Sequence, residues 1–288
     1  MAGFILLCAL MAQSQNPGLP FETSARGEFR RDIEFANIGG VSLTLDAWIP
    51  EGAGPFLSVI VVHGGGFVNG NKQTYVKPLF APLADAGFVW FTINYRLAPQ
   101  YRFPAAVEDV HRAIEFVKMH AREFKADPHR LALVGESAGG YLVSYACAEN
   151  KQDSNVAAVV SFYGPHDFES RARTEGKLSD SAKAFFGVTE LDASAFSVLR
   201  KVSPINLVKR DTPPFLLIHG TQDAQVSYQQ SVLMCEKIRK AGGQCELYTI
   251  QGAGHGVGGW EDKPYTGAYK RKMVEWLRET LSAAKPRH

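Results

Sequence analysis

The sequence predicts an α/β fold, in which a mostly parallel, twisted sheet carries helices on both faces. Short apolar runs, typical of strands buried on both sides, alternate along the 288 residues with longer segments whose apolar residues recur at helical spacing. The apolar runs lie at 30–35, 41–49, 57–62, 88–93, 131–134, 156–162, 215–218 and 246–250. We therefore expect an eight-stranded sheet whose first two strands form an antiparallel hairpin at one edge.

The composition favours one globular domain over 15–288. Apolar residues make up 45% and charged residues 21% of the chain, and the formal net charge is +2. This balance gives no reason to expect nucleic acid or an anionic membrane as a partner. Because the chain shows no linker, repeat or metal-binding spacing, we expect no second domain, no cofactor and no metal. The sequence leaves the oligomeric state open.

The N-terminus reads MAGFILLCALMAQSQ, an apolar run followed by polar residues. This pattern is typical of a secretory signal, with a small-x-small cleavage site at 12–14. It predicts a signal peptide over 1–14 and a secreted or periplasmic protein. A cytoplasmic protein is the alternative, because no Lys or Arg precedes the run, and the run is too short to insert stably in a membrane.

Three glycines directly follow the apolar run at 57–62, in the sequence HGGGF over 63–67. Glycines at the end of a buried strand let the backbone approach a ligand closely with its N–H groups free, which a nascent oxyanion requires. A phosphate-binding loop is the alternative, but no Gly-Lys-Ser/Thr sequence follows. We therefore expect Gly65 and Gly66 to supply oxyanion donors.

A helix opens at Pro104, after the run at 88–93. Its apolar residues recur at helical spacing, at Val107, Val110, Ile114 and Val117. This stripe should face the core, which would leave His111 on the solvent side.

The run at 131–134 turns abruptly into a second helical segment, 138–148, through the sequence GESAG. In this strand–turn–helix pattern the serine, Ser137, projects above the sheet at the start of the helix. The flanking glycines, Gly135 and Gly139, remove the Cβ atoms that would clash with a strained corner residue. A serine that merely caps the helix is the alternative.

Two later strands end beside residues that can complete a catalytic group. Asp223 follows the run at 215–218, and His255 lies in a glycine-rich loop after the last run. Loops at the carboxyl edge of a parallel sheet are where open α/β folds build their sites. The chain order Ser137, acid, histidine is that of the α/β-hydrolases, in which the histidine takes the serine proton and the acid orients the imidazole. Asp167, after the preceding strand, is the alternative acid.

The motifs HGGGF, NYRLAP, GESAGG, GTQD and GAGHG follow the same order in hormone-sensitive-lipase-like esterases, which the chain resembles from residue 41 to its C-terminal helix. SLTLDAWIP, FPAAVEDV and SFYGPHDF look more like bacterial acetyl xylan or feruloyl esterases. The resemblance implies an α/β-hydrolase fold with Ser137, Asp223 and His255 as catalytic triad. It also implies that Ala138 joins the two loop glycines as an oxyanion donor.

The function implied is that of a serine carboxylic-ester hydrolase working through an acyl-enzyme. Its substrates would be short-chain or aromatic acyl esters, small or linked to a polysaccharide. A general carboxylesterase or lipase-like enzyme, and a peptidase or amidase on the same fold, are the alternatives, because all share the triad. A catalytically silent binding protein is disfavoured by the presence of every triad member.

The walls of the pocket are less well defined by the sequence. Phe67, Tyr141 and Tyr228 follow the motifs closely and are candidate pocket residues, each with a place in the core as the alternative. The segment 163–214 has two interpretations, ordinary crossover helices or a short cap beside the site. Many family members carry a helical N-terminal cap, whereas here only about a dozen residues separate the predicted cleavage site from the first expected strand. This departure from the family pattern argues against a deep, lid-covered pocket.

Cys235 and Cys245 lie ten positions apart, on an expected helix and on the strand that follows it. A disulfide between them requires an oxidising compartment and a suitable Cα separation, which spacing alone does not establish. The sequence therefore leaves this bond open.

Overall fold

The computed structural model describes residues 19–149, 151, 154–261 and 266–284, so the predicted signal peptide lies outside the described part and stays a prediction. One sheet contains β1 (Gly27–Ile38), β2 (Val41–Pro50), β3 (Phe56–Val62), β4 (Val89–Ile93), β5 (Ala126–Glu136), β6 (Ala158–Phe162), β7 (Phe215–Gly220) and β8 (Cys245–Ile250). Their order is β1-β2-β4-β3-β5-β6-β7-β8. β2 runs antiparallel to both of its neighbours, and every later pair is parallel.

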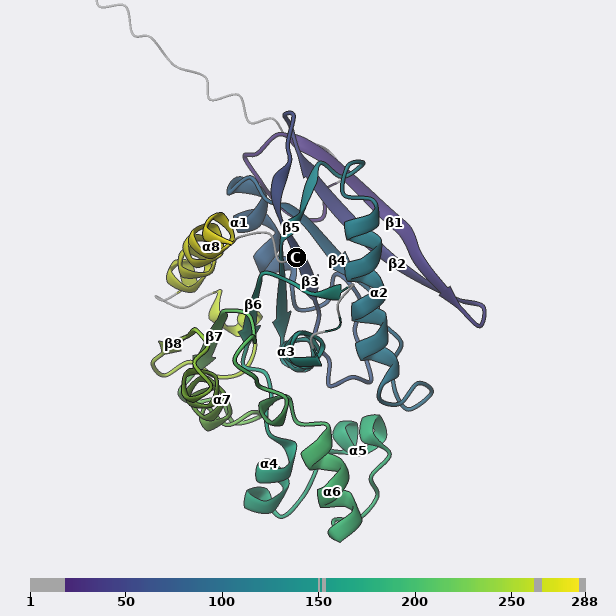
Figure 1. The fold of residues 1–288 in the computed structure, drawn as a ribbon, viewed down its shortest axis with the longest axis vertical. Coiled ribbons are helices and arrows are strands. Elements are labelled where there is room, and N and C mark those ends of the chain that lie inside the picture. Colours follow the sequence, from purple (N-terminus) through teal and green to yellow (C-terminus); the bar gives the residue numbers. More distant parts are fainter. Residues whose placement is uncertain (1–18, 150, 152–153, 262–265, 285–288) are drawn as a thin grey trace, which may run out of the picture.

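Helices cover the two faces of this sheet (Figure 1). They are α1 (Phe80–Asp85), α2 (Ala105–Met119), α3 (Ala138–Glu149), α7 (Gln229–Lys240) and α8 (Thr266–Ala283). Successive strand residues point to opposite faces, so Ile60 packs with α2 and α3, whereas Val61 packs with α1 and α8. The uniformly apolar strands predicted from the sequence are those buried between these two helical layers. None of the described helices is long and apolar enough to cross a bilayer.

The prediction that His111 faces solvent is wrong. Its side chain is buried between α2 and α3, with Nε2 2.9 Å from a carboxylate oxygen of Glu149 and Nδ1 2.5 Å from Oγ of Ser154. Because α3 packs along α2, the core-facing side of α2 is wider than its apolar stripe. Polar residues beside that stripe are therefore buried too, and they need partners there.

The segment 163–214 forms three short helices, α4 (Phe168–Glu175), α5 (Asp180–Phe186) and α6 (Ala193–Lys201). They lie beyond the carboxyl edge of the sheet and not over a face of it (Figure 1). Because this segment joins the parallel strands β6 and β7, it is also the crossover connection between them, and its action as a lid stays a prediction. Buried apolar side chains hold them together and against the main core, chiefly Phe168, Phe185 and Leu199. We call these three helices the cap.

A disulfide joins Cys235 on α7 to Cys245 at the start of β8, with Cα atoms 5.4 Å apart. This separation is the ordinary one for a disulfide, and the question left open by the sequence is answered by the packing of α7 against β8. Disulfides persist in oxidising compartments. The secreted or periplasmic location nevertheless stays a prediction.

The corner between β5 and α3 is sterically tight. Ser137 occupies it with a φ of 53°, in the left-handed region that bulky residues avoid. A Cβ added at Gly135 would lie 2.3 Å from the carbonyl oxygen of Gly139, and one added at Gly139 would lie 2.1 Å from that of Val62. These are contacts with backbone, which no side-chain rotation can relieve. The backbone therefore leaves no room for a side chain at either glycine, as the sequence predicts.

We expect Gly135→Ala to lower the free energy of unfolding by several kcal/mol, since the new methyl must displace backbone at the sheet edge. Gly258→Ala is the matched control, because a Cβ there meets nothing within 4 Å. Urea unfolding of both variants measures the difference. Equal stability of the two variants would contradict this account of the corner.

Candidate active site

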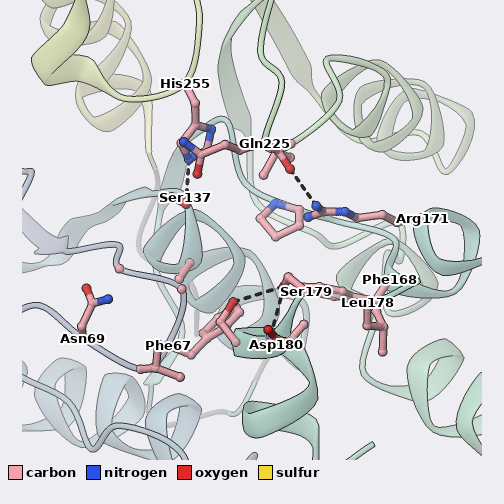
Figure 2. Close-up of a pocket in the computed structure, with 18 of the residues that line it drawn as sticks. Phe67, Asn69, Ser137, Phe168, Arg171, Leu178, Ser179, Asp180, Gln225 and His255 are labelled. Atoms are coloured by element: carbon pink, nitrogen blue, oxygen red, sulfur yellow. Dashed lines mark hydrogen bonds between the residues drawn. The ribbon is translucent and has the colours of Figure 1, made fainter. Parts of the chain in front are cut away.

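Three side chains from three loops form a hydrogen-bonded series at the carboxyl edge of the sheet. Ser137 follows β5, Asp223 follows β7 and His255 follows β8. Nε2 of His255 lies 3.0 Å from Oγ of Ser137 (Figure 2). Its Nδ1 lies 2.6 Å from Oδ2 of Asp223. Because a carboxylate only accepts, Nδ1 carries the proton and Nε2 is left to accept from the serine hydroxyl. The structure thus brings the three predicted residues together in the arrangement that proton removal from serine requires.

The carboxylate of Asp223 is fully buried and held from both sides. Oδ1 accepts the backbone N–H groups of Gln225 and Val226, each at 2.8 Å. Oδ2 lies 2.6 Å from Nδ1 of His255 and 3.2 Å from Nε2 of His219. Burial alone would raise the pKa of Asp223, but the hydrogen bonds from these histidines and from Val226 hold it well below its ordinary range. The carboxylate is therefore charged whenever the protein is folded near neutral pH.

Asp167, the alternative acid, lies elsewhere. Its Oδ1 accepts the N–H of Ser170 at 2.9 Å and caps the start of α4. This is an ordinary helix-capping role, and it accounts for the residue fully.

His219 is a site residue that the sequence analysis missed. Its side chain is completely buried, with Nδ1 2.7 Å from Oγ of Ser231 and Nε2 2.9 Å from the carbonyl oxygen of Val226. A carbonyl oxygen only accepts, so Nε2 carries the proton, and this N–H also faces the carboxylate of Asp223. The sequence feature that could have indicated this role is the position of His219 at the end of β7, four residues before Asp223.

Glu136 and Tyr163 form a second buried polar group behind Ser137. Oε1 of Glu136 accepts the N–H of Gly64 at 2.9 Å, and the hydroxyl of Tyr163 accepts the N–H of Val257 at 2.8 Å. The ring of Tyr163 packs on that of His255, with centroids 4.6 Å apart. Burial raises the pKa of Glu136 to about 7, against the opposing effects of the His255 charge, the Gly64 N–H and the Tyr163 hydroxyl. This group links the glycine loop to the histidine loop.

Backbone N–H groups suited to an oxyanion lie beside the serine. Gly65, Gly66 and Ala138 line the same cavity as Ser137. Within the described part of the chain, the N–H groups of Gly65 and Gly66 have no acceptor. Ala138 is the first residue of α3, where helical N–H groups have no intrahelical partner. All three predicted donors therefore line the cavity that contains Ser137.

The cavity in front of Ser137 has a volume of about 810 Å³. Phe67, Phe168 and Leu178 form an apolar part of its wall (Figure 2). Helices α4 and α5 of the cap and the turn between them supply Phe168, Leu178 and many of the polar lining residues. Its polar lining residues are Asn69, Arg171, Glu175, Lys177, Ser179, Asp180, Ser181 and Gln225. The described residues include no cluster of His, Cys, Asp or Glu that could hold a metal ion.

The predicted pocket residues are only partly brought together. Phe67 lines the cavity, but the predictions for Tyr141 and Tyr228 are wrong. Tyr141 is fully buried and donates to the carbonyl oxygen of Val202 at 2.8 Å, because α3 directs it beneath the cap. Tyr228 precedes α7, and its hydroxyl lies 2.6 Å from that of Thr249 on the neighbouring strand.

The fold and this serine–histidine–aspartate arrangement define an α/β-hydrolase, which confirms the fold class predicted from the sequence. More specifically, residues 45–238 match the model of the BD-FAE family, and the chain belongs to that family.

Two curated relatives come from Mycobacterium tuberculosis. Esterase LipC is 33% identical over 229 residues, which cover 74% of this chain and 56% of LipC. The probable carboxylic ester hydrolase LipM is 30% identical over 232 residues, covering 75% of this chain and 53% of LipM. The chain thus spans about half the length of these relatives. They confirm the resemblance to esterases indicated by the motifs.

A solved structure described as a truncated carbohydrate esterase from gut microbiota shares the fold, with a TM-score of 0.79 and 25% identity. The superposition covers 91% of this chain and 99% of that one.

We expect the contact between His219 and Asp223 to assist turnover. His219→Leu removes the N–H that faces the carboxylate, and kcat should fall about tenfold to a hundredfold, as for loss of a hydrogen bond to a charged group. His219→Gln, whose amide can still donate, should retain more activity. In an Asp223→Asn background His219→Leu should add little further loss, so a full additive effect in this double-mutant cycle would contradict the coupling.

Glu136 should make stability depend on pH. With its pKa raised to about 7 from an ordinary value of 4.5, the folded protein keeps a proton that the unfolded chain releases. Wild-type stability should therefore fall as pH rises from about 5 to about 7, by at most a few kcal/mol. Glu136→Gln, which still accepts from Gly64, should lack this component. Parallel pH profiles of the two proteins, measured by urea unfolding, would contradict the raised pKa.

Proposed function

We propose that this chain hydrolyses carboxylic esters through an acyl-enzyme on Ser137, and that its substrates are short-acyl esters of carbohydrates. The observation that carries the esterase activity is the hydrogen-bonded series from Ser137 through His255 to Asp223 beside free backbone N–H groups. The names of LipC and LipM support the same activity.

Each residue has one chemical task in this proposal. His255 takes the proton of Ser137 as Oγ bonds to the ester carbonyl carbon, and Asp223 stabilises the imidazolium that results. The N–H groups of Gly65, Gly66 and Ala138 bind the oxyanion. The alcohol leaves with the proton from the histidine. Water then attacks the acyl-enzyme by the same steps and releases the acid.

A short acyl group is supported by the aromatic wall of the cavity. The ring of Phe67 stacks on that of Phe185, with centroids 4.1 Å apart, and Phe168 packs against Phe186 at 4.7 Å. Phe67 and Phe168 line the cavity yet are only 3% and 2% exposed, so the cavity ends on closely packed rings. A long acyl chain would have to displace them.

A carbohydrate as the alcohol is supported by the polar remainder of the lining. Hydroxyl, amide, carboxylate, guanidinium and ammonium groups surround the space above Ser137, and together they can pair with several sugar hydroxyls. The gut-microbiota structure with the same fold is named as a carbohydrate esterase. An acetylated plant polysaccharide is the substrate class that combines these features.

A general short-chain carboxylesterase is the second candidate. LipC and LipM are named as an esterase and a carboxylic ester hydrolase, without mention of a carbohydrate. This candidate shares the triad and the aromatic wall, and differs only in the alcohol that is released.

For p-nitrophenyl esters we expect kcat/KM to peak between acetate and butyrate. Each buried methylene is worth about 0.8 kcal/mol, so a deep pocket would instead give a continued rise with chain length. Ser137→Ala should lower kcat by on the order of 10⁴-fold or more and serves as the background control. Release of acetate from acetylated xylan separates the two candidates. An optimum at octanoate would contradict the short acyl site, and absence of acetate release would favour the general esterase.

A further inference from the structure

We infer that Tyr75 forms a stacking surface for the sugar ring that carries the ester, at the mouth of the cavity. This inference rests on the proposed function and names the residue that would select the alcohol. The ligand class is a pyranose, whose axial C–H groups form an apolar face that packs flat on an aromatic ring.

Tyr75 combines two features that are unusual for an aromatic residue. Its side chain is 54% exposed, and among the large apolar side chains of the described residues only Met119 and Val198 are also exposed. Tyr75 lines the same cavity as Ser137. In the part of the chain that the structure describes, its hydroxyl has no hydrogen-bond partner. The ring therefore contributes little to the folded core and faces the space where the alcohol of a substrate lies.

The backbone at Tyr75 is also strained. Its φ is 65°, in the left-handed region, which is unfavourable for a bulky residue. Glycine or asparagine would fit that conformation at lower cost. Neither burial nor a hydrogen bond within the chain offsets this cost at Tyr75, so packing does not account for an aromatic residue there.

The turn that carries Tyr75 is anchored on both sides. On one side, Nζ of the buried Lys72 lies 3.2 Å from a carboxylate oxygen of Asp46. The backbone N–H of Lys72 donates to the side-chain oxygen of Asn94 at 2.9 Å. On the other side, Val76 is completely buried in the core. A turn held in this way loses little backbone freedom when a ligand binds, which favours binding at Tyr75.

Polar groups lie around the same space. Asn69 is exposed in the loop that precedes Tyr75, and Lys177 and Asp180 are exposed on the facing cap, all three lining the cavity. An apolar ring beside exposed hydrogen-bonding groups matches the two kinds of surface that a pyranose presents. A purely aliphatic alcohol would leave the hydrogen-bonding groups unused.

The test compares two esters with the same acyl group. The ratio of kcat/KM for an acetylated xylo-oligosaccharide to that for ethyl acetate should fall about tenfold in Tyr75→Asn, mainly through KM, because stacking acts before and during the reaction alike. Asparagine is chosen because it tolerates the left-handed backbone and so keeps the turn. Tyr75→Phe, which keeps the ring, should retain the wild-type ratio. p-Nitrophenyl esters are avoided, since their own ring could stack on Tyr75.

Met119→Asn is the matched control, because Met119 is an apolar residue that is 76% exposed and does not line the cavity. It should leave the ratio unchanged. An unchanged ratio in Tyr75→Asn would overturn the inference, and so would a loss in Tyr75→Phe as large as in Tyr75→Asn. A fall in kcat/KM for methyl ferulate in Tyr75→Asn as large as the fall for the acetylated xylo-oligosaccharide would also overturn it, because the ring would then hold the acyl group.

Binding without turnover separates this inference from the proposed function. Calorimetric titration with an unacetylated xylo-oligosaccharide should detect binding to the wild type and markedly weaker binding to Tyr75→Asn. Such a difference would support the subsite even if acetylated xylan were not hydrolysed. No binding to the wild type would overturn the subsite even if simple esters were cleaved.

Discussion

The turn from β5 into α3 has no room for a side chain at Gly135 or Gly139, and this steric constraint fixes the position of Ser137 between them. Backbone atoms of Gly139 and Val62 occupy the space that side chains at Gly135 and Gly139 would need. The N–H of Ser137 donates to the carbonyl oxygen of Phe162 on β6 at 2.9 Å, so the strained residue is tied to the sheet. A strained conformation persists only where its surroundings determine it in this way. Every other site residue is placed relative to this corner.

Buried polar groups then align the remaining loops with that corner. Glu136 bonds the glycine loop through Gly64, while Tyr163 bonds the histidine loop through Val257. Burying such groups is costly unless they are satisfied, and a satisfied network in a low dielectric is strong and directional. Burial of the Glu136 carboxyl lowers stability. The same network holds the loop with the predicted oxyanion donors at a fixed distance from the loop that carries the imidazole.

Local sequence patterns located Ser137, Asp223 and His255 because each stands just after its own strand, and strand ends of a parallel sheet meet at one edge. The same reasoning could not locate His219, which is the last but one residue of β7 and owes its role to the loop that folds back over it. The prediction that Tyr141 lines the pocket is wrong for a related reason. Proximity to a motif in sequence does not say in which direction a helical side chain points. The direction in which a helical side chain points depends on tertiary packing, which periodicity alone does not encode.

In the proposed reaction, the reacting groups and the groups that meet the substrate come from different parts of the chain. Ser137 and its partners are attached to the ends of central strands, whereas most of the cavity wall comes from the cap and from the loop between β3 and α1. A hydrogen bond connects the cap to the triad loop: Arg171 of the cap donates to the carbonyl oxygen of Gln225 at 2.7 Å, and the N–H of Gln225 donates to Asp223. Substitutions in the cap can therefore change which ester fits without moving the serine. This separation explains why the chemistry can be inferred from strand ends, while the alcohol must be inferred from side chains such as Tyr75.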